Sequence, residues 1–343
     1  MAGIFENQIV KKYKLTKKCE FMKNVKNASR SLNELLVEKM TVMRQEGRAS
    51  HRNYRTILRT IETHYGVVKM SDVNAQFAAN LHKLLKSEGK SAATIKTYFA
   101  ILQSVTNYGA YLGLVRGDAK LTRSKSYELD KVKLEKPKKR QGSYFTKDDI
   151  KKLWEYWLSI GDTPKGVKRW LGLFFASYLS NGANMADLAR LRFDKEWTNS
   201  KGMALGFYRH KVLNTTGVYV RIPVTDELKM VIEAIGDEYQ YNGLVFGSFM
   251  NDVDLTDEEA VDLRIMYINT YASRVLRKVC KQLGLRDDCS FTFARHSYCT
   301  ILNGEGVNYA IIERNLGHSL GITDNYLGEI PLDKLFEANS HLL

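Results

Sequence analysis

The sequence predicts a mainly α-helical protein with one small β-sheet and two domains. Its 343 residues exceed what a single hydrophobic core usually organises. Apolar residues recur at helical spacing along most of the chain. Residues 204–224 differ, because they are rich in Tyr, Val, Phe and Ile around a turn at residues 214–217. That composition is typical of a β-hairpin.

The first predicted domain is a bundle of four amphipathic helices with short connections. The helical segments cover residues 31–47 and 50–66, a third that begins near Asp72, and residues 91–115. Ser91 is placed to cap the fourth helix. The apolar positions that we expect to share one face in each helix are Leu32, Leu35, Leu36, Met40, Met43, Tyr54, Ile57, Leu58, Ile61, Phe77, Leu81, Leu84, Leu85, Ile95, Tyr98, Ile101, Leu102 and Val105.

A basic linker is expected between the two domains. Apolar periodicity fades over residues 117–142, and the end of this stretch is strongly positive around Pro137. We therefore predict a helical domain at residues 29–116 and a second domain at residues 143–343. Residues 1–28, with their Lys-Lys-Tyr-Lys-Leu-Thr-Lys-Lys cluster, are interpreted as a basic N-terminal arm or tail.

The second domain begins with a helix that Thr146 can cap, with Asp148 and Asp149 in its favourable first turn. Residues 169–180 are almost entirely apolar, so we expect a buried central helix there. The predicted hairpin follows, and from Asp226 onward the pattern alternates between helices and loops.

The charge favours a polyanionic partner. Lys and Arg number 52 against 38 Asp and Glu, a formal net charge of +14. A basic enzyme that never meets nucleic acid is the alternative. The sequence has no apolar run long enough to span a membrane and no signal-peptide core, so a cytoplasmic protein is expected. Neither a disulfide scaffold nor a zinc site is expected, because the cysteines are few and scattered: Cys19, Cys280, Cys289 and Cys299. No cofactor is expected.

The last part of the chain holds the residue types that phosphoryl transfer to a tyrosine needs. Arg295 lies in Ala-Arg-His-Ser, and His318 in Leu-Gly-His-Ser is followed eight residues later by Tyr326. An arginine can stabilise the charge that builds on the non-bridging oxygens, and a histidine can act as acid, base or donor. Lys211, just before the predicted turn, could protonate the leaving 5′-oxygen. We expect His296 to be a hydrogen-bonding core residue.

These motifs resemble the C-terminal signature of the tyrosine recombinases, or phage-type integrases. The helical pattern of residues 91–115 resembles the last helices of the family's N-terminal core-binding domain, so the resemblance covers about residues 30–335 in all. The resemblance implies an N-terminal helical core-binding (SAM-like) bundle and a C-terminal tyrosine recombinase catalytic domain. It also implies a site-specific integrase or invertase, independent of metal and ATP, that cuts and rejoins DNA through a 3′-phosphotyrosyl intermediate. Tyr326 would be the nucleophile, assisted by Arg295, His318 and Lys211.

Two positions depart from the family pattern. Asn184 stands where the family has its first catalytic arginine, and Thr292 where it has a histidine or lysine. Integrases of some mobile elements also lack the first arginine. Three explanations stay open: a nearby arginine replaces it, the enzyme works with one arginine, or catalysis is impaired. The candidates for the replacement are Arg190, Arg192 and Arg209.

The resemblance also implies partners. Double-stranded DNA would lie in a clamp of the two domains, bound by a homotetramer on paired sites, with an accessory DNA-bending protein and a nucleoid location in a bacterial host. The tail, residues 327–343, would either be exchanged between protomers or pack on its own domain. Alternative functions are a catalytically impaired DNA-binding regulator and a type IB topoisomerase-like enzyme. The residues expected to contact DNA are Arg52, Arg55, Arg59, Lys96, Lys136, Lys138, Lys139, Arg140 and Arg209.

Overall fold

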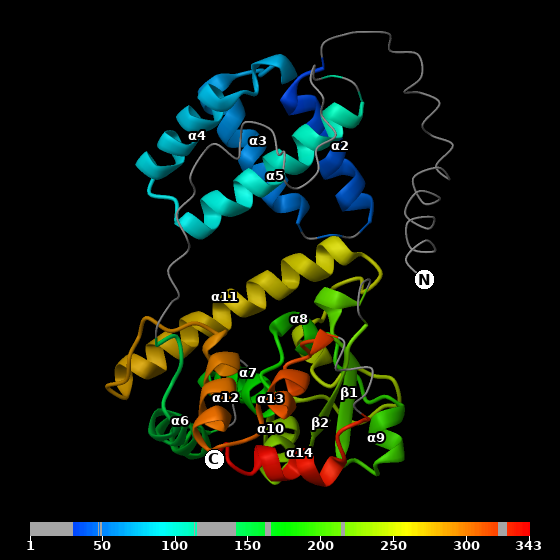
Figure 1. The fold of residues 1–343 in the computed structure, drawn as a ribbon. Helices are drawn as coiled ribbons and strands as arrows, with labels where there is room; N and C mark the ends of the chain where they lie inside the picture. The colour runs from blue at the N-terminus through cyan, green and yellow to red at the C-terminus, as the bar shows by residue number, and fades with distance from the viewer. Residues whose placement is uncertain are drawn as a thin grey trace. The chain divides into compact units, whose positions relative to one another are not determined.

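The structure, a computed structural model, describes residues 30–46, 48, 50–112, 114, 142–161, 166–213, 217–321 and 328–343. The described residues divide into two compact units, one within Met1–Lys139 and the other within Arg140–Leu343. Most of them are helical, and the second unit contains a two-stranded sheet (Figure 1). The predicted fold class, mainly α with a small β-sheet, is confirmed.

The first unit is the predicted bundle of helices. Ser31 and Glu34 form a capping box at its first helix, and the Ser91 hydroxyl accepts a hydrogen bond from the Thr94 amide, as expected for a cap. Nearly all the predicted apolar positions are buried, although Met40, Met43 and Leu84 are only partly covered. The elements are α2 (Leu32–Gln45), α3 (His51–Tyr65), η2 (Met70–Asp72), α4 (Ala75–Ser87) and α5 (Ala92–Tyr111).

The second unit is built around a buried helix, α7, against which α10, α11 and α12 pack. Every α7 residue from Leu171 to Leu179 is buried, as the apolar run predicted. Thr146 caps α6 in a capping box with Asp149. The elements are α6 (Lys147–Ser159), α7 (Val167–Leu179), α8 (Met185–Leu188), α9 (Lys195–Asn199), β1 (Ala204–Tyr208), η4 (His210–Val212), β2 (Tyr219–Pro223), α10 (Asp226–Ile235), η5 (Gly247–Phe249), α11 (Glu258–Gln282), α12 (Phe293–Gly304), α13 (Tyr309–Asn315) and α14 (Leu332–Asn339).

The predicted hairpin is formed by β1 and β2, which pair antiparallel. Ala204 lies opposite Pro223 at one end of the pairing, and Tyr208 lies opposite Tyr219 at the other. The hairpin delivers residues 209–211 from the end of β1. Its strands therefore position any side chain that acts from this segment.

A buried polar network joins the C-terminal helix to the rest of the unit. Asn339, at the end of α14, donates to the side chain of Asn181 over 2.9 Å. The Tyr298 hydroxyl is 3.1 Å from the Asn339 side-chain oxygen and accepts a hydrogen bond from Asn315. Asn181 in turn donates to the Arg221 carbonyl in β2. Because buried polar groups are costly without partners, this network fixes how α14 packs on its own unit.

Candidate active site

Arg295 is anchored by carbonyls from two other segments. It projects from α12, and its guanidinium donates to the carbonyl of Gly182 over 3.0 Å and to that of Leu316 over 2.6 Å. The turn after α7 makes the first contact possible, because Asn181 and Gly182 both adopt positive φ, 55° and 63°. A Cβ atom on Gly182 would lie 2.9 Å from the Arg295 Cα, so only glycine allows this approach.

A helix C-cap places His318. Gly317 follows the end of α13 with a φ of 67°, and its N–H donates to the Arg314 carbonyl. The His318 N–H donates to the Glu313 carbonyl over 2.9 Å. These two bonds form a Schellman motif. The Leu-Gly-His sequence is thus a helix stop that sets the position of the histidine.

Gly317→Ala is expected to lower the free energy of unfolding. The loss should exceed about 1–2 kcal/mol, which is the backbone strain of an L-residue at positive φ. An added Cβ would lie 2.9 Å from the Arg209 Cδ and 3.0 Å from the Val220 Cγ2. Gly284 has the same φ with nothing within 4 Å, so Gly284→Ala measures the strain alone. Urea unfolding of the two variants checks the difference. Equal losses would show that Arg209 does not pack against Gly317.

The His318 ring connects a carboxylate to Arg295. Its Nδ1 lies 3.0 Å from Glu313 Oε2, and its Nε2 lies 3.2 Å from a terminal nitrogen of Arg295. The sequence prediction did not include Glu313. The sequence does carry a signal for Glu313. It is the third residue from the end of the helix, and a Schellman motif brings that residue close to the residue that follows the glycine.

Three arginines were candidates for the missing first arginine, and two of them are engaged elsewhere. Arg190 forms an ion pair with Glu258 over 2.8 Å. Arg192 donates to the Asn242 carbonyl in a loop over 2.6 Å. Neither contact leads to Arg295.

Arg209 is the candidate that lies beside Arg295. Its side chain is buried, with 8% of its surface exposed, and donates to the Gly317 carbonyl over 3.0 Å. Its Nε has no hydrogen-bond partner among the described residues. Burial, followed by the positive charge of Arg209, lowers the pKa of Arg295 to about 10, so Arg295 stays charged at neutral pH. The site therefore contains a second cation, and this one is buried and approaches from the end of β1.

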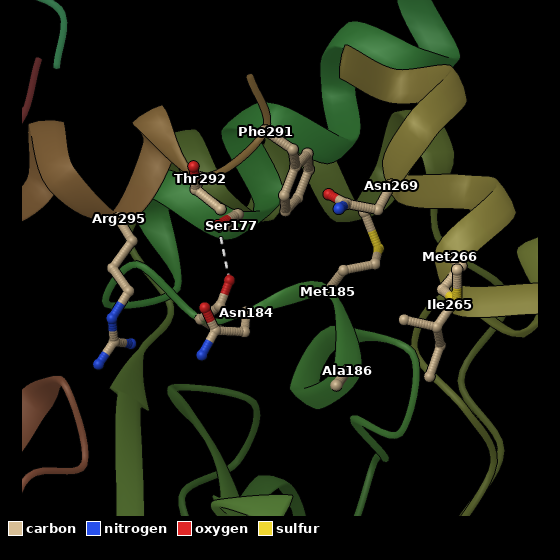
Figure 2. A pocket seen from close by; sticks show the side chains of 11 residues that line it. Ser177, Asn184, Met185, Ala186, Ile265, Met266, Asn269, Phe291, Thr292 and Arg295 are labelled. Atoms are coloured by element: carbon tan, nitrogen blue, oxygen red, sulfur yellow. Dashed lines mark hydrogen bonds between the residues drawn. The ribbon is translucent and has the colours of Figure 1, made fainter. Parts of the chain in front are cut away.

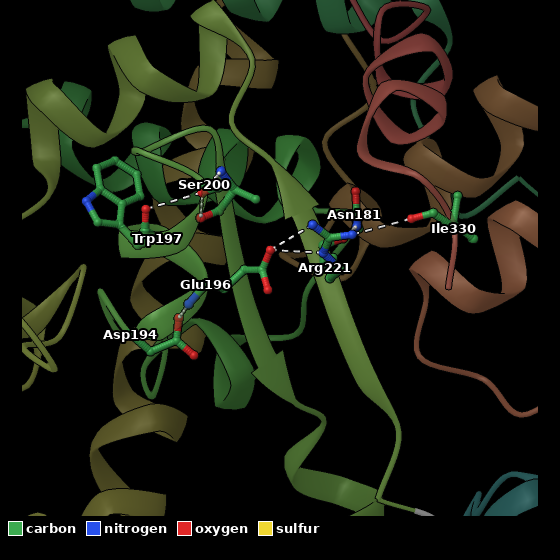
Figure 3. Close-up of polar contacts among 8 residues, drawn as sticks. Asn181, Asp194, Glu196, Trp197, Ser200, Arg221 and Ile330 are labelled. Carbon is green, nitrogen blue, oxygen red and sulfur yellow. Dashed lines mark hydrogen bonds and ion pairs between the residues drawn. The ribbon is translucent and has the colours of Figure 1, made fainter. Parts of the chain in front are cut away.

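The hairpin behind Arg209 is held by an ion pair. Arg221 in β2 pairs with Glu196 of α9 over 2.8 Å, and its guanidinium lies 3.5 Å from the Ile330 carbonyl (Figure 3). Asn181 donates to the Arg221 carbonyl over 2.8 Å. Lys211 follows on η4 with an exposed side chain. These contacts fix the strands and leave the lysine at the surface.

Asn184 and Thr292 line a cavity of about 210 Å³ next to Arg295. Figure 2 shows all three side chains around this space, with Met185 and Met266 also on its wall. Asn184 precedes α8 without a side-chain capping bond. A longer side chain at position 184 would thus find open space beside Arg295.

The remaining predicted residues are distributed as follows. His296 is exposed, so the expectation that it is a core hydrogen-bonding residue is wrong. In the first unit, Arg52 and Arg55 on α3 are half-buried, whereas Arg59 on α3 and Lys96 on α5 are exposed. Other predictions lie outside the described residues: the nucleophile Tyr326, the N-terminal arm, and the linker residues Lys136, Lys138, Lys139 and Arg140.

Solved structures of one integrase resemble this chain. The integrase of transposon Tn1549 in complex with transposon right end DNA matches 91% of this chain and 99% of its own, with a TM-score of 0.60 and 14% identity. Its complex with circular intermediate DNA matches 90% and 99%, with a TM-score of 0.56 and 15% identity. The chain has the fold of the tyrosine recombinases. No protein-family model and no curated protein matches the sequence, so the likeness lies in the three-dimensional structure.

The tyrosine recombinase fold confirms the resemblance found in the sequence motifs at the level of architecture. It brings Arg295, His318 and Arg209 together from α12, the end of α13 and the end of β1. In the described part of the chain, no His, Cys, Asp and Glu side chains cluster in a way that could hold a metal ion. The described helices include none with the length and apolar character of a membrane span.

Proposed function

We propose that the chain is a site-specific DNA recombinase, an integrase or an invertase, that cuts and rejoins double-stranded DNA through a 3′-phosphotyrosyl intermediate. The observation that carries the proposal is the clustering of Arg295, Arg209 and His318, which come from three different elements. A phosphodiester bound at this cluster would meet two positive charges where its own charge builds during attack. The DNA-bound Tn1549 integrase, which shares the fold, supports the same reading.

In the proposed reaction, the Tyr326 oxygen attacks the scissile phosphorus and forms an O–P bond. The bond from phosphorus to the 5′-oxygen breaks, and Lys211 supplies the proton that the leaving oxygen needs. Arg295 and Arg209 neutralise the non-bridging oxygens. A 5′-hydroxyl from a partner strand then reverses these steps, so the energy of the broken bond is retained in the phosphotyrosine.

The proposed DNA contacts extend beyond the pocket. The helical domain, residues 29–116, would bind the phosphate backbone through Arg52, Arg55, Arg59 and Lys96. The basic linker, residues 117–142, would add contacts that weaken as salt concentration rises. The proposal further comprises a homotetramer on paired sites, an accessory DNA-bending protein, and a tail exchanged between protomers, in a protein that acts at the nucleoid.

The test starts by selecting bound duplexes from a random DNA pool, because the target sequence is unknown. The selected duplex is then nicked at successive positions, so that a short cleaved fragment diffuses away and the covalent complex accumulates. Wild-type protein is expected to form an adduct that survives denaturation, and Tyr326→Phe is expected to form none. Because the phenolic oxygen is the nucleophile in the proposal, an adduct that persists in Tyr326→Phe would refute its assignment.

Two other outcomes decide between the alternatives. Specific binding without any adduct would identify a DNA-binding regulator that uses the same fold. Relaxation of a supercoiled plasmid that lacks the selected sequence would identify a type IB topoisomerase-like activity. The alternative of impaired catalysis is motivated by Asn184, whose neutral amide can donate a hydrogen bond but cannot neutralise charge.

A further inference from the structure

We infer that Cys280 and Cys289 form a redox-active thiol pair, which a hydroperoxide closes into a disulfide bond. Cys280 lies near the end of α11, and Cys289 lies in the connection that leads to α12. Both are free thiols with 0% and 1% of their surface exposed, and their Sγ atoms are 3.7 Å apart. The proposed recombinase chemistry does not use this pair, so the inference stands independently of it.

Hydrogen bonds outside the pair hold both cysteines in place. The Cys280 carbonyl accepts a hydrogen bond from the Leu285 N–H over 2.8 Å, in the turn that ends α11. The Phe291 N–H donates to the Ser273 hydroxyl over 2.9 Å, which ties the chain to α11 two residues after Cys289. The backbone therefore brings the two sulfurs together without the help of a covalent bond.

The distance between the sulfurs suits the formation of a bond. A disulfide bond is roughly 2 Å long, so sulfurs that are 3.7 Å apart must approach by about 1.7 Å. Rotation about the two Cα–Cβ bonds moves sulfur atoms by distances of this size. A metal ion suits the pair less well, because no third His, Cys, Asp or Glu side chain joins it within the part of the chain that the structure describes.

The two sulfurs take different roles in the oxidation. The hydrogen bond between the thiols lowers the pKa of Cys289 and raises that of Cys280, so Cys289 forms the thiolate. This thiolate attacks an oxygen of hydrogen peroxide, the O–O bond breaks, and a sulfenic acid forms as hydroxide leaves. The Cys280 thiol then attacks the sulfenic sulfur and releases water. Two thiols are thereby oxidised to one disulfide, and one peroxide is reduced to two molecules of water.

The bond would close the connection between α11 and α12 into a ring. In this connection Arg286 donates to the Gly142 carbonyl, and its guanidinium lies 5.1 Å from the centre of the Phe293 ring in α12. Arg295 belongs to the same helix. Because a cross-link removes conformational freedom from the chain that it encloses, oxidation would restrict the segment that leads into the helix of Arg295.

Peptide mapping of the full chain tests whether the bond forms in the folded protein. Reduced protein is treated with hydrogen peroxide, the remaining thiols are blocked, and trypsin digestion follows without reductant. Trypsin cuts after Lys281 and Arg286, between the two cysteines, so the bond is seen as a link between two peptides. The linked peptides are expected, and a dithiol reductant should separate them. Cys299→Ser, which changes a partly exposed thiol on α12, is the control and should give the same link.

Two results would overturn the inference. One is the absence of the link after a peroxide treatment that oxidises Cys299. The other is a link that appears only in urea, because the folded arrangement would then not favour the bond.

Hydrogen exchange measures the consequence for the connection. The hydrogen-bonded amides of Leu285 and Phe291 are expected to exchange about 10-fold more slowly in the oxidised protein, since the bond opposes local opening. Equal exchange in the reduced and oxidised protein would show that the bond does not restrict this segment.

Discussion

Arg209→Lys is expected to slow covalent attachment to DNA by roughly 100- to 1000-fold, the usual consequence of losing a preorganised charged donor. Lysine keeps the charge but replaces a planar fork of donors with a single ammonium group. Arg209 uses one terminal nitrogen to hold the Gly317 carbonyl and leaves its Nε without a partner among the described residues. A lysine cannot hold that carbonyl and a phosphate in the same geometry. The rate of adduct formation on the nicked duplex is the measurement.

Two variants control this prediction. Arg192→Lys changes an arginine whose guanidinium donates to a loop carbonyl, and it is expected to react at the wild-type rate. Asn184→Arg, added to Arg209→Lys, is expected to recover part of the lost rate, because the cavity of about 210 Å³ beside Asn184 can take a guanidinium. A wild-type rate in Arg209→Lys would favour the explanation that the enzyme works with one arginine.

Lys211→Ala is expected to slow cleavage by roughly 100-fold or more on ordinary DNA, because the leaving 5′-oxygen would depart without its proton. The side chain is exposed on η4, so its removal should not affect the stability of the fold. The loss should largely disappear on DNA with sulfur in place of the scissile 5′-oxygen, since a thiolate leaves without protonation. Cleavage of both substrates is followed as adduct formation.

Lys229→Ala, which changes an exposed lysine on α10, is the control and should cleave both substrates as wild type does. A defect in Lys211→Ala that sulfur does not rescue would assign the lysine to phosphate binding.

Local rules predicted most of the fold. Capping residues such as Ser91 and Thr146, and the apolar run in α7, are signals carried by adjacent residues, so the sequence displays them directly. Arg209 could not be distinguished from Arg190 and Arg192 in this way. The contact between Arg209 and the Gly317 carbonyl joins residues 108 positions apart in the chain, and no local pattern encodes it.

Residues of the candidate site could be predicted from the sequence only where they lie in a recognisable motif. Leu-Gly-His indicated His318, but the role of its ring depends on Glu313 and Arg295, which approach from opposite sides. The expectation for His296 failed for a related reason. It neighbours Arg295 in sequence, but successive residues of a helix point in different directions, and His296 faces solvent.

The asparagine contacts of α14 also constrain how the tail could be exchanged between copies of the chain. A second copy carries the same helix, so its Asn339 would offer the same atoms to Asn181 and Tyr298. The contact energy is then equal for a helix from the same molecule and one from its neighbour. A tethered helix has an effective concentration on the order of millimolar, which free copies in solution do not match. The asparagine contacts therefore do not favour exchange of the tail over packing on its own unit. A preference for exchange must come from copies of the chain that are held close together and from the geometry of the segment that leads to α14.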